Sequence, residues 1–122
     1  LKQIQDIYNN TDVLYSVYST DVPDSKNWNN AMPVKSFEAI ITLTPIIASK
    51  NTVLGNFIEE KDIGYTVDEN TEDIMNLFKR LINNPNMLEE KVENLKKIQY
   101  AYTWENVVTN LRNIYDIGGK YE

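Results

Sequence analysis

A short apolar run, Pro45-Ile46-Ile47-Ala48-Ser49, restricts the folds that are open to this chain of 122 residues. The run is continuous, with no polar position between the apolar ones. Runs of this length and composition are typical of strands that are buried on both faces, and such strands occur mainly in parallel sheets. The run therefore predicts a strand within the parallel sheet of an α/β protein.

Helical and strand-like patterns alternate on both sides of this run. A helical pattern opens the chain, with apolar residues at Leu1, Ile4, Ile7 and Tyr8. The elements predicted after it are, in order, a strand at residues 12–16, a helix at 33–43, the strand at 45–49, a short helix at 51–60 and a third strand at 63–68. This alternation predicts an α/β fold with a partial doubly wound, Rossmann-like parallel sheet.

Three further helical faces close the chain. The first has Thr71 as its expected N-cap and Asn84-Pro85 as its stop, and the second covers residues 88–98. The third begins with Trp104, which we expect in core packing or in docking against a neighbouring domain. Residues 1–122 are thus predicted to form a single domain, and a sheet of about three strands leaves one flank as an edge.

Composition excludes several classes of chemistry. The chain has no Cys and no His, which excludes disulfides, thiolate or imidazole metal sites and every nucleophile that depends on a His base. Its formal net charge is −6 and its Lys and Arg residues are interleaved with acids, so we expect no nucleic acid partner. No apolar run approaches the roughly 20 residues that cross a bilayer, and we expect a cytoplasmic protein.

A candidate ligand site lies where a long polar loop, residues 18–32, leads into the helix of residues 33–43. The free N–H groups of a first helical turn attract a diphosphate, and Lys35 can add a positive charge. Glu38 lies about one turn into the helix and can accept two hydrogen bonds from a vicinal diol such as that of ribose. Composition alone favours a plainer interpretation, in which the helix dipole stabilises Glu38 and Lys35 is solvated.

Further residues of this segment match a longer pattern, which reads Pro-x-Lys-x-apolar-Glu, a helix and then Pro-Val-Ile-Ala-Ser. The matching positions are Pro33, Lys35, Phe37, Glu38 and the run that begins at Pro45. In this, the chain resembles the retaining GT-B glycosyltransferases of family 4. The resemblance continues in "IYNNTDVLYSVYS", at Gly64 and in the closing helices, including the aromatic-Thr-Trp-Glu that opens the last one, and so covers nearly the whole chain.

The resemblance implies a fold, a ligand and a role for each residue of the segment. The chain is expected to be the second half of a GT-B C-terminal domain, with closing C-terminal helices. Glu38 would hydrogen-bond the ribose of a UDP-sugar or GDP-sugar donor, and the backbone of Val34, Lys35 and Ser36, after Pro33, would face the diphosphate. No other cofactor and no metal are expected.

The acceptor and the remaining site groups are expected outside this chain. A glycan or lipid-linked acceptor would bind a missing N-terminal domain. The full-length enzyme would act in polysaccharide biosynthesis and could associate peripherally with a membrane. The cationic residues that usually neutralise the donor phosphates would also lie upstream. We therefore expect this fragment to be inactive alone.

The chain departs from the family pattern at two positions. Asn30 stands where the family often has a first Glu that contacts the donor sugar, so it can still bond a hydroxyl but supplies no charge. Leu43 stands where the family usually has Gly, which affects how the helix turns into the strand. These departures leave open a non-catalytic GT-B-like interaction or regulatory module. A phospho-receiver module is disfavoured because Asp12 opens its strand instead of following it.

Overall fold

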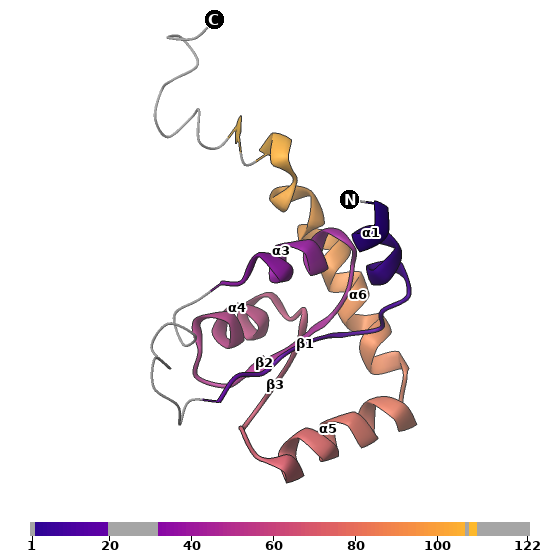
Figure 1. Ribbon diagram of the computed structural model, residues 1–122, viewed down its shortest axis with the longest axis vertical. Coiled ribbons are helices and arrows are strands. Elements are labelled where there is room, and N and C mark those ends of the chain that lie inside the picture. The colour runs from indigo at the N-terminus through magenta and orange to yellow at the C-terminus, as the bar shows by residue number, and fades with distance from the viewer. Residues whose placement is uncertain (1, 20–31, 107, 110–122) are drawn as a thin grey trace, which may run out of the picture.

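The computed structural model describes residues 2–19, 32–106 and 108–109, and it shows an α/β fold (Figure 1). Helices and strands alternate along the chain as predicted. Their order is α1 (Lys2–Asn9), β1 (Leu14–Ser16), α3 (Val34–Ile41), β2 (Ile46–Ser49), α4 (Val53–Lys61), β3 (Gly64–Val67), α5 (Thr71–Asn83), α6 (Asn86–Ile98) and the 3-10 helix η1 (Gln99–Tyr102).

The three strands form one parallel sheet in the order β1-β2-β3. Leu14 is in register with Ile46, and Ile46 with Gly64. A Cβ atom at Gly64 would collide with the backbone of Ile46, so glycine permits the close approach of β3 to β2 at this point. The predictions of an α/β fold and of a parallel sheet are confirmed, and the assignment to half of a GT-B domain stays a prediction.

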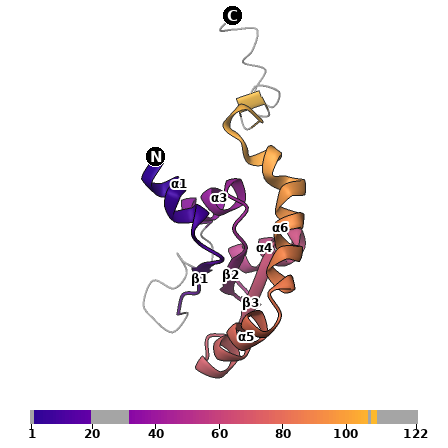
Figure 2. The same cartoon turned by 90° about the vertical axis from the view of Figure 1, so that its right-hand side faces the viewer.

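Helices cover both faces of the sheet, as Figures 1 and 2 show. All four residues of β2 are buried, as the continuous apolar run predicted. Ile46 and Ala48 pack against the helices on one face, while Ile47 packs on the other face against α5. The first core also takes residues from α1, α3, α4 and α6, namely Tyr8, Ala39, Ile40, Leu54, Ile58 and Leu95.

The start of α5 differs from the prediction. Asn70, not Thr71, is the N-cap, and its side chain accepts a hydrogen bond of 2.7 Å from the N–H of Asp73. The Asp73 carboxylate in turn accepts from the N–H of Asp68 at 2.7 Å. Asn caps a helix at least as well as Thr, so residue type does not choose between these two neighbours. Asn70 is the cap because its backbone has the extended conformation of a cap residue.

Trp104 is also placed differently from the expected core position. The residue is 74% exposed, because the described chain that follows η1 lies away from the sheet (Figure 2). The prediction that Trp104 packs in the core is therefore wrong, and its docking against a neighbouring domain stays a prediction. None of the helices in the described part of the chain combines the length and the apolar character that crossing a membrane requires.

Candidate functional site

The N-terminus of α3 presents open backbone donors. Pro33 has extended backbone angles and no polar side chain, so nothing from the cap residue occupies the N–H groups behind it. Ser36 N–H already donates to the Pro33 carbonyl at 2.9 Å. Among the described residues the N–H groups of Val34 and Lys35 have no hydrogen-bond partner, as expected for the first turn of a helix, and both of these residues are exposed. An exposed helix start of this kind attracts anions.

The side chain of Ser36 lies behind this turn. Ser36 is fully buried, and among the described residues it is the only one with a buried side-chain polar atom that lacks a hydrogen-bond partner. An unpaired buried hydroxyl costs about 1–3 kcal/mol. Unsatisfied groups of this type are uncommon in stable proteins and often mark a place where water or a ligand completes the structure.

The Glu38 side chain accepts a hydrogen bond from a residue of the first helix. The hydroxyl of Tyr8, on α1, donates to Glu38 Oε2 at 2.9 Å and also lies 3.4 Å from the carbonyl oxygen of Lys35. Tyr8 is only 9% exposed. Burial, followed by the hydrogen bond to Glu38 and by its negative charge, raises the pKa of Tyr8 to about 12.

The sequence places Tyr8 on the apolar face of the first helix and within a segment that resembles the family pattern, and neither observation predicts a contact with Glu38. The available signal was general, since a buried tyrosine usually finds a partner for its hydroxyl. The residues of the predicted site, Val34 to Glu38 after Pro33, do lie within one stretch of helix start. Asn30 lies outside the described residues, so its contact with a donor sugar stays a prediction.

The carboxyl ends of β1 and β2 are tied together near this helix start. Ser49 Oγ accepts from the N–H of Tyr18 at 3.1 Å and lies 3.2 Å from its carbonyl oxygen. One residue further, Lys50 forms an exposed ion pair of 3.4 Å with Asp68, which follows β3. Lys50 thus places a cation at the carboxyl edge of the sheet, where ligands of open α/β sheets bind. No sequence pattern predicts this position for Lys50.

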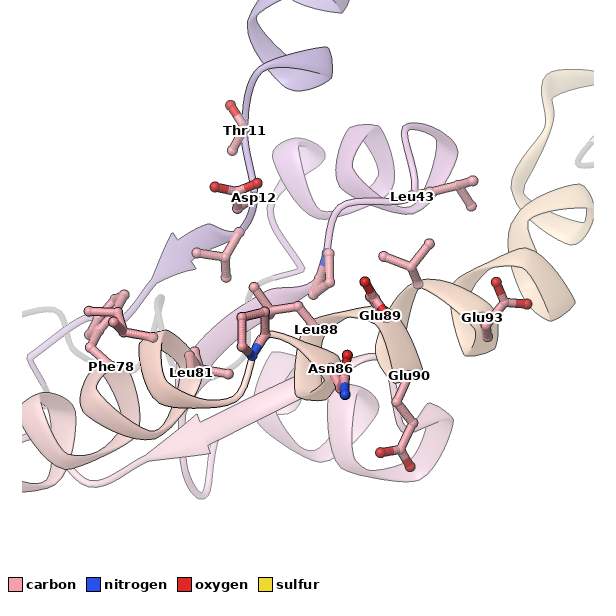
Figure 3. A pocket seen from close by; sticks show the side chains of 15 residues that line it. Thr11, Asp12, Leu43, Phe78, Leu81, Asn86, Leu88, Glu89, Glu90 and Glu93 are labelled. Carbon is pink, nitrogen blue, oxygen red and sulfur yellow. The ribbon is translucent and has the colours of Figure 1, made fainter.

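An open groove of about 930 Å³ lies at the opposite end of the sheet, before the strands begin (Figure 3). Thr11, Asp12 and Leu43 lie along one side, and α5 and α6 form the other, where Glu89 lies between Leu88 and Glu93 (Figure 3). Its apolar floor includes Val13, Pro45, Phe78, Leu81, Leu88 and Val92. None of the residues Pro33 to Glu38 lines this groove, so it is separate from the predicted site.

No three acidic side chains among the described residues lie together in a way that could hold a metal ion. The expectation that no metal takes part stays a prediction.

Comparisons with protein-family models, with curated proteins and with solved structures find no match to this chain.

Proposed function

We propose that this chain is the donor-binding segment of a retaining glycosyltransferase with the GT-B architecture. In this proposal the start of α3 binds the diphosphate of a UDP-sugar or GDP-sugar, and Glu38 binds the ribose. The observation that carries the proposal is the pairing of open N–H groups at Val34 and Lys35 with a carboxylate one turn later. Their spacing suits a ligand in which an anion and a diol are adjacent.

Two features of the surroundings support this proposal. The helix follows the carboxyl end of a parallel strand, which is the usual ligand edge of an open α/β sheet. The resemblance of Pro33, Lys35, Phe37 and Glu38 to the family pattern independently assigns the same two roles to the same positions. The plainer interpretation, in which Glu38 serves only the helix dipole, does not account for its position between a buried tyrosine and an open helix start.

The role of this segment would be positioning and charge stabilisation. As the bond between sugar and diphosphate breaks, negative charge grows on the diphosphate, and preorganised N–H donors and a helix dipole stabilise it. The acceptor, a glycan or a lipid-linked sugar, would be bound by another domain. The isolated segment would therefore bind donor weakly and transfer nothing.

Ligand-observed NMR tests the proposal directly. Saturation-transfer difference spectra of UDP, GDP and their common sugar conjugates would be recorded with the wild-type chain, with Glu38→Ala and with Glu72→Ala. Glu72 is the matched control, because it is an exposed acid in the first turn of α5. We expect one nucleotide to give signals with the wild type and with Glu72→Ala, strongest on its ribose protons, and to lose them with Glu38→Ala.

The opposite outcomes are equally clear. Signals that survive in Glu38→Ala would show that the nucleotide binds elsewhere on the chain. No signal from any nucleotide at millimolar concentration, for this chain and for the full-length protein alike, would refute the proposed function.

A further inference from the structure

We infer that Tyr8 is a positioning residue that fixes the Glu38 carboxylate for the recognition of a ribose diol. This inference rests on the proposed function, because it assigns a purpose to a contact within the proposed donor site. Tyr8 and Glu38 are 30 residues apart in the sequence, and the fold brings them together by packing α1 beside α3 (Figures 1 and 2).

The direction of the hydrogen bond determines which carboxylate oxygen remains open. An ionised carboxylate can only accept, so Tyr8 must donate its single hydroxyl proton to Glu38 Oε2. No described residue donates to the other oxygen, Oε1. Glu38 is partly exposed, so its side chain is not fully enclosed by the described residues. The contact thus occupies one oxygen and leaves the second available.

The burial of Tyr8 makes it a rigid partner. Its ring belongs to the same core as Ala39 and Ile40 of α3, and only 9% of the residue is exposed. A free glutamate side chain samples several rotamers, and fixing it costs up to about 2 kcal/mol. A carboxylate that is already held by a buried phenol has lost most of this rotational freedom before the ligand binds, so less entropy is lost on binding.

Tyr8 also connects the two halves of the proposed site. Its hydroxyl lies 3.4 Å from the carbonyl oxygen of Lys35, in the turn whose N–H groups would face the diphosphate. The same oxygen atom therefore touches both the anion-binding turn and the diol-binding carboxylate. A shift of α1 relative to α3 would change the distance between these two groups.

A purely structural role for Tyr8 makes a different prediction. If the hydrogen bond only fastens α1 to α3, its removal weakens all ligands alike or none of them. If it positions Glu38, its removal weakens ligands with both ribose hydroxyls and spares ligands that lack one. The ratio of two affinities therefore separates the roles, because a general loss of stability cancels in that ratio.

The experiment measures the affinities of UDP, GDP and their 2′-deoxy analogues by NMR titration of the wild type, Tyr8→Phe and Tyr65→Phe. Tyr65 is the matched control, since its hydroxyl donates to the Met87 carbonyl at 2.9 Å, away from α3. We expect the wild type and Tyr65→Phe to prefer the ribose ligand about tenfold, the value of one good hydrogen bond to a charged group. In Tyr8→Phe this preference should fall to about twofold.

Glu38→Gln provides a second test that does not depend on the behaviour of one variant. We expect it to reduce the preference for ribose, and we expect Tyr8→Phe to have no further effect on that preference in the Glu38→Gln background. An undiminished preference in Tyr8→Phe would overturn the positioning role and leave the proposed function intact. A wild-type chain that binds these nucleotides with no preference for ribose would also overturn it. If neither this chain nor the full-length protein binds any of them, the positioning role and the proposed function are both overturned.

Discussion

Leu43 has a backbone conformation that ordinarily favours glycine. Its φ is 58°, just after α3, and its N–H donates to the Ile40 carbonyl at 3.2 Å. A left-handed conformation costs a residue with a Cβ atom roughly 1–2 kcal/mol. Replacing Leu43 with Gly removes this strain, and replacing it with Ala retains it. The comparison of these two variants therefore isolates the backbone contribution.

The magnitude follows from what each substitution removes. The Leu43 side chain is partly buried against the core, so both variants lose a similar packing contribution, about 1 kcal/mol. Glycine gains the roughly 1–2 kcal/mol of relieved strain and loses about 0.5–1 kcal/mol through its greater freedom in the unfolded chain. We expect Leu43→Gly to be more stable than Leu43→Ala by about 1 kcal/mol.

Urea unfolding followed by circular dichroism measures this difference. Asn76 supplies the matched control, because it is exposed within α5, where glycine should be less stable than alanine by about 1 kcal/mol. The expected result is opposite orders at the two positions. If alanine exceeds glycine at Leu43, as it should at Asn76, the left-handed strain is smaller than the roughly 1–2 kcal/mol expected and the reasoning is refuted.

Three further perturbations follow from the fold. Tyr8 has a raised pKa of about 12, so its neutral form contributes stability that is complete below pH 10 and is lost as the pH rises through 12; we expect Tyr8→Phe to lose less unfolding free energy between pH 9 and 11.5. Lys91 is nearly buried and ion-paired with the more exposed Asp62, so Asp62→Asn should destabilise by roughly 2 kcal/mol in thermal unfolding and Lys91→Met by less. Gly64→Ala should cost about 3 kcal/mol or more, measured by circular dichroism, because its Cβ collides with the Ile46 backbone.

The sheet could be predicted from the sequence because its determinants are local. The apolar run of β2 specifies a strand buried on both faces regardless of what surrounds it. The sequence also predicts that Leu43, in place of the usual Gly, affects the turn from helix to strand. Its positive φ explains why a glycine would suit that position.

The features that could not be predicted depend on partners that are distant in sequence. Lys91 was part of a charged stretch, yet the fold places it beside Asp62 and 4.8 Å from the centre of the Tyr65 ring. In the sequence Tyr8 is an apolar-face position of the first helix. Its hydroxyl reaches Glu38 only because α1 packs on α3. Periodicity predicts which face is buried, but it carries no information about pairs that join two elements.

The proposed function depends on the binding of a nucleotide diphosphate at the start of α3. Mapping amide chemical shifts of the isotope-labelled chain during titration with UDP and GDP tests it most directly. We expect the largest shifts at Val34, Lys35 and Ser36, and we expect them to extend to Glu38 and to vanish in Glu38→Ala. Shifts confined to residues of the groove at the other end of the sheet, such as Leu88 and Val92, would contradict it.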